Sequence, residues 1–193
     1  RLLNKEVNLS RLYFKQKIKQ SEFMKIQASL VLHLYTKISP KRNSYAGMIF
    51  VREKKLGSAD GTKNLLVLGR GKYKFVWSDF KTHKSMGTII EKIPSNLQKI
   101  LSKHVTYLKR IDPENKHLLL NSKFQPMTRN GLTKFLQSIF QRRFGKSIGS
   151  SALRQIYLSD KYDPKDLAER EATAKSMHHK RSTAELHYIK KKE

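Results

Sequence analysis

The sequence contains no cysteine among its 193 residues. This absence excludes disulfides, thiolate catalysis and zinc sites built on cysteine. Long apolar runs are also missing, since the longest, at residues 30–34, is interrupted by His33. We therefore expect no membrane-spanning helix. No charged segment followed by an apolar one resembles a secretion leader, so an intracellular protein is expected. The chain begins with Arg1 rather than Met, which leaves an upstream domain open.

Acidic residues are scarce. The chain has 15 Asp and Glu against 41 Lys and Arg, which gives a formal net charge of +26. Such an excess destabilises a compact chain unless a polyanion neutralises it. Nucleic acid is the first candidate partner and an anionic membrane surface the second. The acids are scattered along the sequence, which disfavours a metal-dependent nuclease, because that chemistry requires carboxylates converging on a cation.

The first half of the chain is predicted to contain one helix and four strands. Residues 1–24 are polar and basic and are interpreted as an arm, a linker or a fraying helix, followed by one domain over residues 25–193. Apolar spacing predicts a helix from Lys25 that ends before Pro40. Strands are predicted at residues 48–51, 64–68, 73–78 and 88–91. In the third strand Tyr73, Phe75 and Trp77 alternate, which is typical of a half-buried strand. A polar hairpin loop, residues 79–87, joins the last two strands.

The second half is predicted to be helical. Ser95 and Gln98 have the spacing of a capping box. An apolar stripe over residues 132–140 predicts a second helix, closed by Gly145. Further helix starts are predicted at Ser150-Ser151, at Asp163-Pro164 and at Ser182. The fold class predicted is α+β, mainly helical, with a small antiparallel sheet.

Metal-free cleavage of a DNA strand needs a nucleophile, cations for the charge that grows on the phosphate oxygens, and an acid for the leaving oxygen. Arginine suits the second task because its planar fork binds phosphate bidentately and stays charged. A lysine can serve as the acid if neighbouring cations lower its pKa.

Four segments of the sequence contain candidate residues for these tasks, and they follow one another along the chain. The first is Leu34-Tyr35-Thr36 followed by Pro40-Lys41-Arg42, and the second is Phe80-Lys81-Thr82 with Gly87. The third is Ser151-Ala152-Leu153-Arg154, and the fourth is Met177-His178-His179 with Tyr188 nine residues later. Together they resemble the conserved boxes of tyrosine recombinases, in the version found in integrases of large DNA viruses, virophages and related mobile elements. The resemblance covers roughly residues 25–190.

The resemblance implies a site-specific recombinase or integrase that needs no cofactor and no metal. Tyr188 would attack the scissile phosphate, and Arg42 and Arg154 would clamp its oxygens. Lys81 would protonate the leaving 5′ oxygen, and His179 would hydrogen-bond the phosphate. The implied partners are double-stranded DNA and further copies of the chain, as a tetramer on DNA. The implied location is at DNA, in a host nucleus, a viral factory or a virion.

Ser151 departs from the family pattern, which has histidine as a general base at this position. A water held by Ser151 is one substitute for that base. A catalytically silent DNA-binding or packaging protein on the same fold is therefore one alternative, and a type IB topoisomerase is another. The individual residues also have structural alternatives. Tyr188 fits a half-buried core tyrosine, Lys84 lies on the same loop as Lys81, and the two arginines fit nonspecific phosphate contacts.

Overall fold

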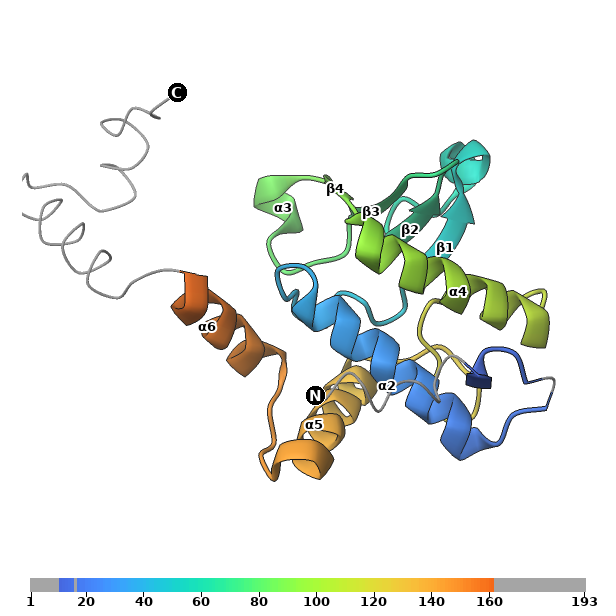
Figure 1. Cartoon of the computed structure of the whole chain (residues 1–193). Helices are drawn as coiled ribbons and strands as arrows, with labels where there is room; N and C mark the ends of the chain where they lie inside the picture. Colours follow the sequence, from blue (N-terminus) through green and yellow to red (C-terminus); the bar gives the residue numbers. More distant parts are fainter. Residues whose placement is uncertain (1–10, 16, 162–193) are drawn as a thin grey trace, which may run out of the picture. The chain divides into compact units, whose positions relative to one another are not determined.

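The computed structural model describes residues 11–15 and 17–161 (Figure 1). The chain divides into two compact units, Arg1–Leu153 and Arg154–Glu193. The first unit contains the sheet and the helices α2 (Gln20–Thr36), α4 (Ser95–Ile111) and α5 (Arg129–Phe144). A further helix, α6 (Ser150–Lys161), crosses from the first unit into the second. No helix of the described ranges is long and apolar enough to cross a membrane.

Helix α2 begins earlier than the sequence indicated. It starts at Gln20 rather than near Lys25, and the Glu22 carboxylate accepts a hydrogen bond from the Lys19 backbone N–H at 3.1 Å, which satisfies the donor of the N-cap residue. Phe23, in the segment interpreted as an arm or linker, is fully buried. The helix ends at Thr36, before Pro40 as predicted.

The four predicted strands are present, but the sheet is mixed and the antiparallel prediction was wrong. The order is β1 (Ile49–Arg52), β2 (Leu65–Leu68), β3 (Tyr73–Trp77) and β4 (Ile89–Lys92), with β1 parallel to β2 and the other pairs antiparallel. Between β1 and β2 the chain forms the 3-10 helix η2 (Glu53–Ser58). A connection of about a dozen residues is long enough to bring the chain back in the same direction.

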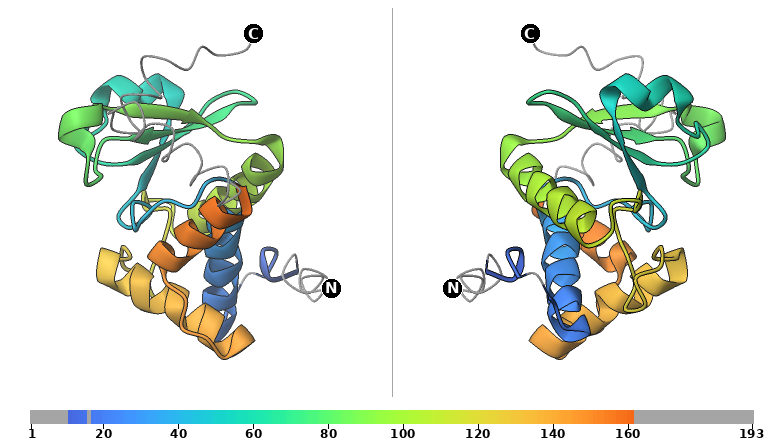
Figure 2. Two further views of the ribbon diagram at one scale, coloured as in Figure 1. Left: turned by 90° about the vertical axis from the view of Figure 1, so that its left-hand side faces the viewer. Right: turned by 90° about the vertical axis from the view of Figure 1, so that its right-hand side faces the viewer.

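Both faces of the sheet are covered. Phe75 and Trp77 belong to the main core, which also contains apolar residues of α2, α4 and α5. On the opposite face Val76 packs with Leu65 and Val67, and Leu56 of η2 covers them. Strand β3 is therefore buried on two faces over its last three residues, while Tyr73 and Lys74 stay partly exposed. Figure 2 shows the sheet on one side of this unit and α2 and α5 on the other, with α4 lying against the sheet.

The predicted ends of the later helices are partly confirmed. Gly145 closes α5 in the left-handed conformation, with φ 67°. The capping box at the start of α4 was wrong, because Pro94 is the N-cap and Ser95 is already helical. The Gln98 side chain bonds the turn before β3 instead, accepting from the Tyr73 N–H at 3.1 Å and donating to the Gly71 carbonyl at 2.8 Å. Helix α6 begins at Ser150, as predicted.

Candidate active site

The loop that carries Arg42 is fixed by its backbone. The Tyr35 hydroxyl donates a hydrogen bond to the Arg42 carbonyl at 2.8 Å, and the Tyr45 hydroxyl donates one to the Leu34 carbonyl at 3.1 Å. The Arg42 side chain is exposed, and within the described residues its guanidinium has no hydrogen-bond or ion-pair partner. Two hydrogen bonds therefore hold the loop backbone, while the Arg42 guanidinium is unpaired among the described residues.

Tyr35, near the end of α2, and Tyr45, in the loop, are structural. Tyr45 is fully buried, and its ring packs edge-on against Tyr35 and Trp77, with centroids 5.5 Å and 5.3 Å away. Burial raises the pKa of Tyr35 and of Tyr45 well above the ordinary value for a phenol. Both hydroxyls therefore stay protonated and act as hydrogen-bond donors, which disfavours either as a nucleophile.

Lys41, next to Arg42, is held by β4. Its Nζ lies 3.1 Å from Glu91 Oε2, and the same oxygen accepts a hydrogen bond from Trp77 Nε1 at 2.8 Å. The ammonium also lies 5.8 Å from the Trp77 ring centroid. Lys41 thus anchors the loop to the sheet, and its charge is balanced by a carboxylate.

The predicted hairpin between β3 and β4 is confirmed, with the short helix α3 (His83–Met86) inside it. Lys81 precedes α3 and is exposed. Lys84, the alternative lysine, is exposed as well, and neither ammonium has a hydrogen-bond or ion-pair partner in the described part of the chain. Both lysines therefore remain candidates for the acid, and Lys81 is favoured only by the resemblance.

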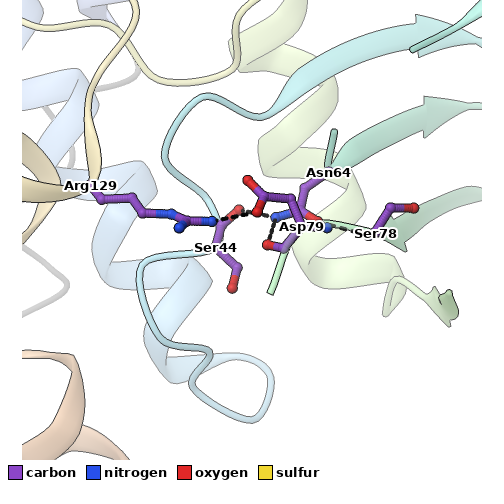
Figure 3. A network of polar contacts seen from close by, with 5 residues as sticks. All are labelled: Ser44, Asn64, Ser78, Asp79 and Arg129. Atoms are coloured by element: carbon purple, nitrogen blue, oxygen red, sulfur yellow. Dashed lines mark hydrogen bonds and ion pairs between the residues drawn. The ribbon is translucent and has the colours of Figure 1, made fainter. Parts of the chain in front are cut away.

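Asn64 joins the two loops (Figure 3). Its Nδ2 donates to the carbonyls of Ser44 and Asp79, each at 2.8 Å. Its Oδ1 accepts from the backbone N–H groups of Ser78 and Asp79, at 2.9 Å and 2.8 Å. Ser44 is two residues from Arg42, and Asp79 is two residues from Lys81. The structure therefore ties together the two segments that the sequence had marked separately.

The first turns of α5 contact both loops. Arg129 Nη2 lies 2.6 Å from Asp79 Oδ1, so this ion pair reaches the Lys81 loop (Figure 3). On the other side, Asn43 Nδ2 donates to Thr133 Oγ1 at 2.6 Å, next to Arg42. Thr128 caps the helix by accepting from the Gly131 N–H at 3.0 Å, which fixes its start. Helix α5 is therefore a common support for the Arg42 and Lys81 loops.

The remaining predicted site residues lie on α6 or outside the described residues. Ser151 is exposed on α6 in the first unit, and Arg154, half-exposed on the same helix, belongs to the second unit. Residues three apart on a helix share a face, so these two side chains lie on one side of α6. His179 and Tyr188 lie outside the described residues, as do the helix starts predicted at Asp163-Pro164 and Ser182.

Sequence reasoning missed Asn64 and also a buried histidine, His104. His104 is fully buried in α4, and its Nε2 bonds the Leu118 carbonyl at 3.2 Å. Burial lowers the pKa of His104 to about 4, so the ring is neutral and structural at neutral pH. No group of three or more His, Cys, Asp or Glu within the described ranges is arranged to hold a metal ion.

The comparisons with known proteins give no family for the chain. No protein-family model, no curated protein and no solved structure matches it.

Proposed function

We propose that this protein is a tyrosine recombinase or integrase that cleaves and rejoins DNA through a 3′-phosphotyrosyl intermediate. The observation that carries the proposal is the Asn64 network. The sequence indicated two loops, one with an arginine to bind phosphate and one with a lysine to donate a proton to the leaving oxygen. The side-chain amide of Asn64, which is buried, joins these two loops. A pair of cations held by one rigid support suits a single phosphate, because preorganised charges stabilise a developing oxyanion without reorganisation.

In the proposed reaction the Tyr188 oxygen attacks the scissile phosphorus and forms a phosphotyrosyl bond to the 3′ strand end. The bond from phosphorus to the 5′ oxygen breaks, and Lys81 gives that oxygen a proton. Arg42 and Arg154 bind the non-bridging oxygens, and His179 donates to one of them. A water held by Ser151 takes the phenol proton. Religation reverses these steps with a 5′ hydroxyl from another strand, so the bond energy is conserved and no nucleotide is consumed.

The charge of the chain supports DNA as the substrate. Five acids of the described residues form ion pairs, yet Arg42 and Lys81 are free of carboxylates there. Free cations of this kind bind phosphates by releasing counterions, so log K falls by about 0.9 per phosphate for each tenfold rise in salt. A flat response of duplex affinity to salt would contradict the DNA-binding part of the proposal.

Covalent trapping tests the chemistry. The full chain is incubated with nicked duplexes in EDTA, denatured and examined for a protein–DNA adduct, alongside the Tyr188→Phe variant. We expect an adduct with the wild type and none with Tyr188→Phe, because phenylalanine lacks the attacking oxygen. Tyr73→Phe is the control, because Tyr73 lies at the start of β3, at the opposite end of that strand from the Lys81 loop, and this variant should form the adduct like the wild type. An adduct formed equally by Tyr188→Phe would refute the assignment of the nucleophile.

Two alternatives share most of this site. Ser151, where a histidine base is expected, favours a catalytically silent DNA-binding or packaging protein on the same fold. That alternative predicts tight, salt-sensitive binding with no adduct on any substrate, including sequences from the ends of the element that encodes the chain. A type IB topoisomerase predicts the adduct together with relaxation of supercoiled plasmid and no strand exchange between two duplexes.

A further inference from the structure

We propose that Asn64 is a positioning residue that holds Arg42 and Lys81 at a fixed separation, so that both cations act on the same phosphate. The inference rests on the proposed function for the identity of the phosphate. It goes beyond that function because it assigns a role to a residue that touches neither DNA nor the nucleophile.

The chemistry of the Asn64 side chain explains why an amide occupies this place. A carboxamide offers two N–H donors and an oxygen with two lone pairs. Both donors are used, on the Ser44 and Asp79 carbonyls, and the oxygen accepts from the Ser78 and Asp79 N–H groups. The residue is only 3% exposed, so water does not replace these bonds. A buried polar group with every bond satisfied makes its surroundings rigid.

Asn64 is itself anchored to the sheet. It directly precedes β2, and its carbonyl accepts a hydrogen bond from the Ile49 N–H at 3.2 Å, at the start of the parallel pairing of β1 with β2. The amide therefore connects two loops to a support that belongs to neither of them. Without it, each loop keeps its other contacts, Tyr35 to the Arg42 carbonyl and Arg129 to Asp79, but the direct link between the loops is lost.

Arg42 and Lys81 lie close in sequence to the carbonyls that Asn64 binds, so the position of each cation depends on this link. Arg42 and Lys81 are each two residues from a carbonyl that Asn64 binds, so a loop movement passes almost directly to the side chain. Misplacement of a positioned group by about 1 Å can cost roughly a hundredfold in rate. We therefore expect the phosphate contributions of Arg42 and Lys81 to depend on each other, and that dependence to require Asn64.

Asn64→Asp tests this with little change in shape. The aspartate keeps an oxygen that accepts from the Ser78 and Asp79 N–H groups, but it turns a donor into a second oxygen facing the carbonyls of Ser44 and Asp79. Asn115→Asp is the matched control. Asn115 is 8% exposed, and it both donates to the His117 carbonyl and accepts from the His117 N–H, each at 3.0 Å. Among the described residues its side chain makes no hydrogen bond to either loop.

The measurement is a double-mutant cycle in DNA binding. Affinities for one nicked duplex are measured at fixed salt for Arg42→Ala, Lys81→Ala and the double variant, in the wild-type, Asn64→Asp and Asn115→Asp backgrounds. Backbone hydrogen exchange over residues 42–46 and 78–82 is followed in parallel. If Asn64→Asp does not fold, as judged by Trp77 fluorescence, Asn64→Ser replaces it, since serine removes the bonds without adding charge.

In the wild-type background, we expect the fold-loss of DNA affinity in the Arg42→Ala/Lys81→Ala double variant to differ from the product of the two single fold-losses. This coupling factor should be roughly threefold or more. The factor should fall to about one in Asn64→Asp and persist in Asn115→Asp, and exchange should rise in both loops only in Asn64→Asp. An unchanged factor in Asn64→Asp, or a factor of one in the wild type, would overturn the inference. If the coupling is found but no covalent adduct forms, the inference holds for phosphate binding and the proposed cleavage fails.

Discussion

Acidification should destabilise this protein through His104. The ring is fully buried, its Nε2–H donates to the Leu118 carbonyl, and its Nδ1 is buried with no hydrogen-bond partner in the described residues. The edge-on Tyr13 ring lies 6.3 Å away by centroid. Protonation would place a second N–H and a charge in an apolar core. For this reason burial lowers the pKa of His104 from 6.5 to about 4.

The direction and size of the effect follow from these two values. Between pH 6.5 and pH 4 the unfolded chain binds a proton at His104 that the folded chain does not, so protons favour unfolding in that range. The stability that the fold gains from burying a neutral His104 is present in full above pH 6.5 and is lost as the pH falls toward 4. Taken from about pH 7 to about pH 5, the loss from this group is about 2 kcal/mol of unfolding free energy.

Urea unfolding at the two pH values, followed by Trp77 fluorescence and far-UV circular dichroism, measures this loss. His104→Gln should be less stable than the wild type near pH 7 but should lose about 2 kcal/mol less on acidification. Leu101→Ala is the matched control, because it weakens the same helix without removing a titrating group, and its loss on acidification should equal that of the wild type. If His104→Gln and the wild type lose the same free energy, the reasoning is refuted.

Two smaller perturbations test the fold around the site. Gly145→Ala should lower the free energy of unfolding by about 1 kcal/mol, measured as a lower Tm, because alanine is strained at φ 67°. Gly57→Ala is the control: a Cβ there meets open space, so stability should change by less than about 0.5 kcal/mol. Equal effects of the two substitutions would contradict the role given to Gly145 as the cap of α5. Glu91→Gln should cost about 1 kcal/mol, because the half-buried Lys41 loses its counter-charge while Trp77 keeps an acceptor. Thermal unfolding measures it, and an unchanged Tm would show that the pair contributes nothing.

The elements of the fold could be predicted where one pattern determined them. The apolar stripe over residues 132–140 and the glycine after it predicted α5. A stretch rich in β-forming residues predicted the four strands, with alternation visible in the third. Strand direction was not predictable, because the same residues fit parallel and antiparallel pairing and the connection through η2 decides between them. The start of α2 was missed for a different reason. Lys19 is not a preferred cap residue and so does not mark the helix start at Gln20; the local signal is Glu22, whose carboxylate accepts from the Lys19 N–H.

The candidate site was predictable only for residues that carry chemistry in their own side chains. Arg42 and Lys81 could be chosen because a phosphate needs cations. Asn64 could not be chosen, because an asparagine at the edge of a strand is an ordinary turn residue. Its importance comes from partners 15 and 20 positions away, and only the folded chain brings them to one amide.

The scarcity of acids has a structural counterpart at this site. Asp79 and Glu91 lie closest in sequence to the predicted lysine and its hairpin, and each is already paired, Asp79 with Arg129 and Glu91 with Lys41. These ion pairs hold the loops in place and neutralise the two carboxylates. Arg42 and Lys81 are left without a carboxylate among the described residues. Two exposed cations without a nearby carboxylate attract an anion, and this charge distribution supports the proposal of phosphate chemistry carried by side chains.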